Sequence, residues 1–403
     1  MKRFKLIKLL FQIYSGKKPK LEEVEKMGLL SIKLCQYYAL RIDFLDEDLC
    51  IHLAKLYEKS YEKRPKKLSE IIGENNWIFK KLISYEEYPF ASASIGQIHR
   101  GILKGGEKVA IKIKRKKFKN QFIEDIENSK KIFKVVLFFY PKLKKVFNPL
   151  IALEEIKKST LNELDFKNEV NGAIFFESLK IKNSLKYNLS KLKFSNFYLE
   201  DCNENVLVSK FIEGDSFNKL LNEKKLEYKT LLELFKYHSF YMFRLGVFHG
   251  DLHPGNILVD KKGFINLIDC STVGEISEKL REGLFGFFYY LSRYDYLKAS
   301  EYLNKMSITS IKEENFIRFQ REFLKLYENF KDKTVGEVSL TRKMMETIKL
   351  GVNYNMEFGQ GMFHVIKSLM YLDGMVLKCD KNINLMEDIR EYTGLFKKEM
   401  EVP

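Results

Sequence analysis

Long apolar runs, cysteine pairs and prolines are all scarce in this sequence of 403 residues. No stretch approaches the roughly 18 uninterrupted apolar residues of a membrane-spanning helix, so we expect no transmembrane segment. The five cysteines are scattered and odd in number, and no two of them form a Cys-x-x-Cys pair. This pattern argues against a disulfide framework and against a zinc site, and it favours a cytoplasmic location.

What remains is the composition of a folded protein with a strong positive charge. Hydrophobic residues make up 45% and charged residues 31% of the chain, which is enough for a large buried core. The formal net charge of +16 suits an anionic partner such as a nucleotide or an acidic membrane surface. Because the lysines are dispersed and no recognised binding motif accompanies them, we expect no nucleic-acid partner.

The first 14 residues predict a basic amphipathic helix. Phe4, Ile7, Leu10, Phe11 and Tyr14 fall on one face, and the lysines lie largely elsewhere. Such a helix can lie on an anionic membrane or pack against the body of the protein, and the sequence leaves both open.

The order of helical and strand-like patterns predicts an α+β, bilobal protein-kinase-like fold. Helical periodicity covers about 20–84, a strand hairpin with a Gly105-Gly106 turn lies within 88–116, and amphipathic helices follow to about 180. A strand-like segment spans 205–214, and the rest is helical apart from 247–275. We expect three parts: a helical N-terminal extension at 1–87, a small β-rich N-lobe with a helical insertion at 88–213, and a mainly helical C-lobe at 214–403.

The most informative segment is VFHGDLHPGNILVDKKGFINLIDC, residues 247–270. Asp251 lies five residues before Asn256, two short apolar runs around Gly263 predict a hairpin, and Asp269 follows the second run. Protein kinases use this order so that the first Asp faces the nucleophile while the Asn and the later Asp bind Mg²⁺ on the phosphates. We therefore predict ATP and Mg²⁺ as cofactors, Asp251 as the catalytic residue, Asn256 and Asp269 as metal ligands, and His249 as a support for the loop.

A lysine interrupts a predicted apolar strand upstream of this segment. In VAIK, Lys112 alternates with apolar Val109, Ile111 and Ile113. A lysine there is costly unless it is paired or binds phosphate, and kinases pair it with a glutamate on the following helix. The candidates are Glu163 and Glu169, and the alternative is a lysine on the solvated face of an edge strand.

Several segments together resemble the UbiB family of atypical kinase-like proteins. They are KLCQ at 33–36, FASASIGQIH at 90–99, ELDFKNE at 163–169, FHGDLHPGNILV at 248–259 and, faintly, 359–385. The resemblance covers about 30–385. The string HGDLHPGN alone is less specific, since aminoglycoside- and choline-kinase-like proteins use similar strings.

The resemblance implies roles for the residues of these motifs. Lys33, in the KxGQ-type motif that also contains Gln36, would reach the active site and pair with Glu163 and Asp165. That leaves Glu169 as the partner of Lys112. We therefore predict Lys112 and Glu169 as catalytic residues beside Asp251, with Lys112 on the phosphates of ATP.

The resemblance also implies that an alanine-rich loop replaces the glycine-rich loop that covers the nucleotide phosphates in kinases. This ATP-binding loop consists of Ala91, Ser92, Ala93 and Ser94. It has less access to positive φ than a glycine-rich loop, so we expect the nucleotide to sit differently and transfer to a protein hydroxyl to be poor. The two serine hydroxyls would contact phosphate or only cap a turn.

Two departures from the family pattern matter. Cys35 stands where the KxGQ motif has glycine, which puts a side chain where the helix would approach closely. Asp269-Cys270-Ser271 replaces an Asp-Phe-Gly-like tripeptide, so we expect the metal ligand to persist and switching of the loop to be restricted.

The resemblance implies an ATPase or a small-molecule, lipid-directed phosphotransferase that supports isoprenoid quinone or lipid metabolism. Protein kinase activity is not expected. The implied partners are an anionic membrane surface, an isoprenoid lipid, a lipid-biosynthetic complex or a homodimer, and the implied location is peripheral on the inner face of a membrane. Two alternatives stay open: a catalytically silent nucleotide-binding scaffold, and an aminoglycoside- or choline-kinase-like phosphotransferase.

Overall fold

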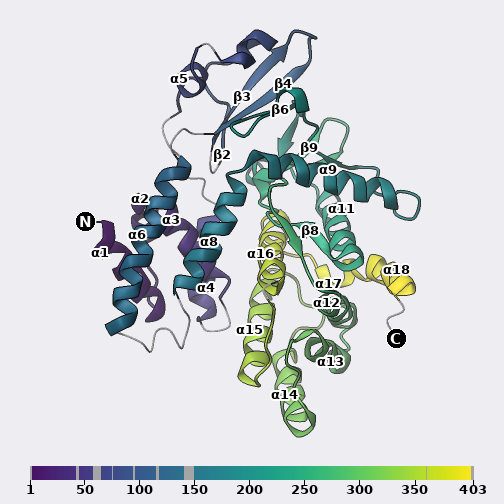
Figure 1. Ribbon diagram of the computed structural model, residues 1–403. Helices are drawn as coiled ribbons and strands as arrows, with labels where there is room; N and C mark the ends of the chain where they lie inside the picture. Colours follow the sequence, from purple (N-terminus) through teal and green to yellow (C-terminus); the bar gives the residue numbers. More distant parts are fainter. Residues whose placement is uncertain are drawn as a thin grey trace. The chain divides into compact units, whose positions relative to one another are not determined.

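The computed structural model consists of two compact units (Figure 1). It describes residues 2–41, 45–57, 65–74, 76–93, 96–114, 118–139, 149–359 and 361–400. The first unit comprises Met1–Asn183, Phe194–Glu213 and Ile268–Thr272. The second unit comprises Ser184–Lys193, Gly214–Leu267 and Val273–Pro403.

The first unit combines a helical part with an antiparallel sheet. Its helices are α1 (Lys2–Tyr14), α2 (Leu21–Met27), α3 (Leu29–Ala39), α4 (Glu47–Ala54), η1 (Lys55–Tyr57), α5 (Leu68–Ile72), η2 (Trp77–Lys81), α6 (Phe118–Phe139), α8 (Pro149–Glu163), α9 (Phe166–Asn183) and η3 (Leu199–Asp201). Its strands are β1 (Leu82–Tyr85), β2 (Ala91–Ala93), β3 (Gly96–Leu103), β4 (Lys108–Lys114) and β6 (Val206–Lys210).

The sheet of the first unit has the order β1-β3-β4-β6, with β2 paired to β3. The predicted hairpin is confirmed, because β3 and β4 pair antiparallel on either side of Gly105-Gly106. Val109, Ile111 and Ile113 are fully buried in the core of this sheet, as their alternation predicts. The predicted helical stretch at 20–84 is wrong at its end, because β1 pairs with β3 from Leu82 onward.

The helical part of the first unit contains the N-terminal helix. In α1, Leu6, Leu9, Leu10 and Ile13 are buried, whereas Phe11 of the predicted apolar face is exposed. Further along, α3 contacts both α6 and α8, which run side by side (Figure 1). These four buried side chains show that α1 packs against the protein, where it contacts α2. Of the predicted face, Leu10 is buried, and Ile7 and Tyr14 are partly buried.

One buried side chain joins β3 to the segment before α5. Gln97 is 1% exposed, its Nε2 donates to the carbonyl of Lys66 at 2.8 Å, and its Oε1 accepts from the backbone N–H of Lys66 at 3.1 Å. Beside it, His99 Nδ1 lies 3.1 Å from the carbonyl oxygen of Glu86. Burial lowers the pKa of His99, so the neutral imidazole donates to this carbonyl.

The second unit is mainly helical. Its strands are β5 (Leu192–Phe194), whose first two residues belong to it, β7 (Gly214–Ser216), β8 (Val247–His249), β9 (Ile257–Asp260), β10 (Ile265–Leu267) and β11 (Val273–Glu275). Its helices are α10 (Phe217–Asn222), α11 (Tyr228–Ser239), η4 (Phe240–Leu245), η5 (Pro254–Asn256), α12 (Glu278–Leu291), α13 (Tyr296–Met306), α14 (Glu313–Leu326), α15 (Leu340–Asn353), α16 (Gly361–Cys379), α17 (Leu385–Asp388) and α18 (Arg390–Met400).

Two pairs of short strands position the catalytic-loop segment within the second unit. β9 and β10 form the predicted hairpin, and Gly263 takes the left-handed conformation at its turn, with φ of 78°. β8 pairs with β11, and α16 contacts both β11 and α11. Of the described helices, none combines the length and the apolar character that a membrane span needs.

Candidate active site

Lys112 lies in the middle of β4 in the first unit, and its ammonium group contacts two carboxylates. Its Nζ donates to Glu169 Oε2 at 2.7 Å and to Asp269 Oδ2 at 3.1 Å. Lys112 and Glu169 are both buried, with 8% and 6% of their surface exposed. The expected partner of Lys112 is therefore confirmed, and Asp269 joins the pair.

The two carboxylates change the acid–base properties of this cluster. Burial lowers the pKa of Lys112, but the carboxylates of Asp269 and Glu169 raise it more, so the pKa lies above its usual value. Burial, opposed by Lys112 and aided by Asp269, raises the pKa of Glu169 to about 7. When both carboxyl groups are ionised, they carry one negative charge more than the ammonium neutralises, which suits a bound cation such as Mg²⁺.

The backbone around Asp269 is held from two sides within the first unit. Asp269 has a φ of 56°, and the hydroxyl of Ser271 donates to its Oδ1 at 2.8 Å. On the other side, a Cβ at Gly172 of α9 would lie 2.0 Å from the carbonyl oxygen of Cys270. Only glycine therefore allows α9 to approach this loop so closely.

The KxGQ-type motif lies on α3. Lys33 Nζ donates to both oxygens of Glu163, at 2.8 and 2.6 Å, and the side chains are 16% and 23% exposed. The expected pairing is confirmed for Glu163 but not for Asp165, whose Oδ1 accepts from the backbone N–H of Lys167 at 3.1 Å. The Lys167 contact caps the start of α9, which gives Asp165 a local role.

The other residues of this motif serve the packing of the extension. Gln36 Nε2 donates to the carbonyl of Leu56 at 3.0 Å, and Tyr57 OH donates to the carbonyl of Gln36 at 2.7 Å. Cys35 is fully buried, and burial raises the pKa of its thiol to about 12. The interior of the helical part accommodates the side chain that replaces glycine, and the thiol is not reactive there.

The alanine-rich segment begins as a strand. Ala91, Ser92 and Ala93 form β2 and pair with Ile98, Gln97 and Gly96 of β3. Ser94 lies outside the described residues. Contact of the Ser92 and Ser94 hydroxyls with phosphate stays a prediction.

The catalytic-loop segment lies in the second unit, where the carboxylate of Asp251 receives several donors. Lys367 Nζ lies 2.9 Å and Tyr371 OH 3.0 Å from its Oδ1, and Asn256 Nδ2 lies 3.2 Å from its Oδ2. Burial raises the pKa of Asp251, but Lys367, His249 and His253 together outweigh it and hold the pKa well below the usual range. The backbone N–H of Asp251 donates to His249 Nδ1 at 3.2 Å, so the expected support by His249 is confirmed.

The amide of Asn256 is oriented in a way that suits a metal ligand. Its Nδ2 donates to the backbone oxygen of Asp251 at 3.1 Å as well as to the carboxylate. Both bonds use the nitrogen, so the amide oxygen, the atom a cation would bind, is turned away from them. The donor chemistry of Asn256 and of Asp269 therefore fits Mg²⁺, which prefers oxygen ligands.

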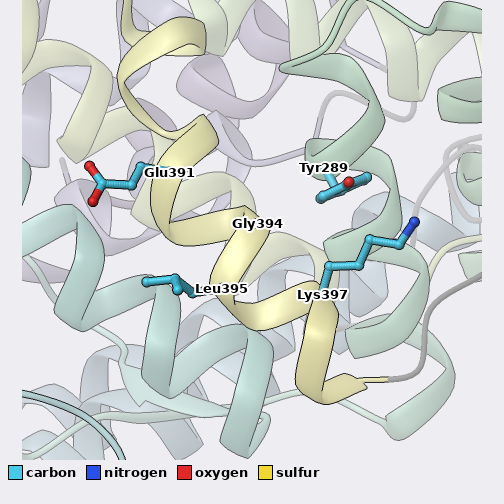
Figure 2. A pocket seen from close by; sticks show the side chains of 5 residues that line it. All are labelled: Tyr289, Glu391, Gly394, Leu395 and Lys397. Atoms are coloured by element: carbon cyan, nitrogen blue, oxygen red, sulfur yellow. The ribbon is translucent and has the colours of Figure 1, made fainter.

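A pocket of about 510 Å³ lies elsewhere in the second unit (Figure 2). It is lined by Tyr289, Glu391, Gly394, Leu395 and Lys397. Lys397 Nζ lies 5.0 Å from the centre of the Tyr289 ring. None of these residues belongs to the motifs of the sequence, and the pocket has no part in the site described here.

Known proteins resemble this chain over most of its length. The profile of the ABC1 atypical kinase-like domain matches residues 66–303, more than half of the sequence. This chain belongs to the ABC1 atypical kinase-like family. The family confirms the resemblance to UbiB proteins and the mixed helix-and-sheet, kinase-like fold, and it makes the protein a kinase-type enzyme in the broad sense.

Three relatives show how similar this chain is to other proteins. The "uncharacterized protein in hydrogenase 1 5'region" of Clostridium pasteurianum is 25% identical over 383 residues, which cover 91% of this chain and 68% of the relative. The probable protein kinase UbiB of Blochmanniella pennsylvanica is 25% identical over 379 residues, covering 92% and 68%. The AarF domain-containing protein kinase 1 of Gallus gallus is 29% identical over 285 residues, covering 68% and 53%.

Sequence reasoning missed four residues that contact or flank the motif residues, two in each unit. Lys367 and Tyr371 contact Asp251 from a helix beyond the family match, and Ser271 and Gly172 hold the Asp269 loop. The only signal for the first two was their spacing of four on a helix with a faint family likeness.

Proposed function

We propose that this ABC1-family protein binds ATP with Mg²⁺ and directs the γ-phosphoryl group to water or to a small, lipid-like acceptor. The observation that carries the proposal is the buried contact of Lys112 with Glu169 and Asp269. A lysine buried in a strand costs free energy unless its charge is used, and kinases use it on the nucleotide phosphates.

The motif residues take distinct roles in this proposal. Lys112 binds the phosphates, and Glu169 orients it. Asn256 and Asp269 would each supply an oxygen ligand to Mg²⁺, which would neutralise charge on the phosphates. Asp251 orients the nucleophile, and the segment from Ala91 to Ser94 covers the nucleotide.

The helical extension supports a small acceptor over a protein acceptor. Lys33 of the extension is engaged with Glu163 at the end of α8, close in sequence to the helix that carries Glu169. We infer that the extension restricts access for a polypeptide. The net charge of +16 and the UbiB relatives favour an acceptor from isoprenoid quinone or lipid metabolism, met at an anionic membrane surface.

Turnover of Mg-ATP by the purified protein tests this function. The assay measures phosphate release with and without anionic liposomes, for the parent protein and for Asp269→Asn, Lys33→Ala and the control Lys381→Met at an exposed site. We expect Asp269→Asn to lose about 100-fold or more in kcat, since a metal ligand is removed, and the control to be unchanged. Absence of Mg²⁺-dependent ATP binding, or an unchanged Asp269→Asn variant, refutes the proposal.

A second candidate is a nucleotide-binding scaffold without turnover. It is favoured by the Asp269 carboxylate, whose two oxygens already accept from Lys112 and from the Ser271 hydroxyl. ATP binding without phosphate release, both with and without liposomes, would favour this candidate over the ATPase or phosphotransferase.

A further inference from the structure

We propose that Lys367 and Tyr371 of α16 are positioning residues that hold the carboxylate of Asp251 in its working orientation. The proposal rests on the function proposed above and deepens it. The ABC1 family match covers residues 66–303, and α16 lies beyond it. The proposal therefore gives this helix a part in the function of Asp251.

Lys367 and Tyr371 both contact the carboxylate of Asp251. Lys367 Nζ and Tyr371 OH lie 2.9 and 3.0 Å from the same oxygen, Asp251 Oδ1. They are four residues apart, which places them on one face of α16. Asn256 Nδ2 holds the other oxygen, Oδ2, at 3.2 Å. Three donors from two segments therefore fix the rotation of the carboxylate about its last bond.

The side chains around these donors are largely buried. Lys367 is only 16% exposed at its side chain, and Tyr371 is buried and packs its ring edge-on against His253, with centroids 5.8 Å apart. Val365, Ile366 and Leu372 of α16 are buried. Since α16 contacts β11, and β11 pairs with the strand that carries His249, the helix and the loop share one support.

A plain ion pair that fastens α16 is the alternative explanation. It predicts that removing Lys367 lowers stability and that ATP binding and turnover decline together. A positioning role predicts a different outcome, because a misplacement of about 1 Å at a reacting group can cost about 100-fold in rate while binding is kept. The two explanations therefore differ in whether kcat falls alone or together with the affinity for ATP.

The kinetic experiment compares Lys367→Met, Lys367→Arg and Tyr371→Phe with Lys378→Met, a control at an exposed site on the same helix. We expect Lys367→Met to lower kcat by about 10- to 100-fold and Tyr371→Phe by about 10-fold, with KM and Kd for Mg-ATP within about twofold. Lys367→Arg restores part of the loss, since guanidinium also donates to the carboxylate. Unchanged kcat, or a common loss of kcat, affinity and melting temperature, overturns the proposal.

A second measurement keeps the proposal testable if the parent protein shows no turnover, a result that counts against the proposed function alone. Each lysine is labelled with an amine reagent and quantified by mass spectrometry, with exposed Lys381 as reference. We expect Lys367 to react at least several-fold faster in Asp251→Asn than in the parent protein, because its carboxylate partner is gone. Equal labelling in both proteins means that the amine does not hold the carboxylate, and the proposal falls.

Discussion

At Gly172, α9 approaches the backbone of the loop that carries Asp269. Replacement of Gly172 by alanine tests how closely the helix and the loop pack. The added Cβ would lie 2.0 Å from the carbonyl oxygen of Cys270 and 3.0 Å from its carbonyl carbon. Neither atom is the far end of a flexible side chain, so the backbone next to Asp269 must move or α9 must shift.

The magnitude follows from two opposing terms. Overpacking a well-filled interior costs about 1–3 kcal/mol, and the contact with backbone puts this case at the upper end. Alanine in place of glycine stabilises a helix interior by about 1 kcal/mol. We therefore expect the free energy of unfolding of the first unit to fall by about 2 kcal/mol. A shift of the Asp269 carboxylate by about 1 Å adds a loss of about 100-fold in ATP turnover.

The single tryptophan, Trp77, makes the first unit observable on its own. It packs against the buried cluster of the sheet, so its fluorescence reports the unfolding of this unit in urea. With a urea dependence of about 1–3 kcal/mol per molar, a loss of 2 kcal/mol lowers the midpoint by roughly 1 M.

The matched control is Asn171→Ala, at the neighbouring exposed position of the same helix. Its free energy of unfolding is expected to stay within about 0.5 kcal/mol of that of the parent protein. If Gly172→Ala has the midpoint and the turnover of the control, the close approach of α9 to Cys270 is refuted.

Three further predictions concern other parts of the molecule. Buried His238 has a pKa lowered to about 3 by burial and by His249. Its stabilising contribution is therefore complete above the unfolded pKa near 6.5 and is lost as pH falls toward 3, and between pH 7 and pH 5 the loss is about 2 kcal/mol. Hydrogen exchange of α11 should show this loss in the parent protein and not in His238→Leu. Gln97→Glu replaces the donor to the Lys66 carbonyl by an acceptor and should lower the free energy of unfolding, followed by Trp77 fluorescence in urea, by about 1–3 kcal/mol. A double-mutant cycle of Lys33→Met and Glu163→Met should give a coupling energy of about 0.5–3 kcal/mol, and additive single effects would contradict the ion pair.

The order of elements could be predicted because most of it is encoded locally. The Gly105-Gly106 turn, the alternation around Lys112 and the hairpin at Gly263 all appear in the structure where the sequence puts them. The helical prediction extends to residue 84 and so covers most of β1 (Leu82–Tyr85). This segment is a strand because it pairs with β3, whose partner residues lie about 20 positions away. Local propensity does not contain that information.

The site could be predicted as far as its motifs reach. From the residues alone, Glu163 and Glu169 were equal candidates for Lys112, and only the family resemblance separated them. The contacts of Asp251 with α16 join residues 120 positions apart in one case, and no local pattern carries them. The close approach of Gly172 to the backbone of Cys270 could not be predicted either, because a sequence does not say which backbone a glycine faces.

The paired bonds of Gln97 with Lys66 have a consequence for how this protein tolerates change. The side-chain amide of Gln97 makes the two hydrogen bonds that the backbone of a neighbouring strand would make. It accepts from the N–H of Lys66 and donates to the carbonyl of Lys66. Of the two residues, only Gln97 contributes its side chain to this contact, so the contact depends on the residue type at position 97. Position 66 contributes only its main chain, so every residue except proline can occupy it, and a mutational scan should find one strict and one permissive site facing each other.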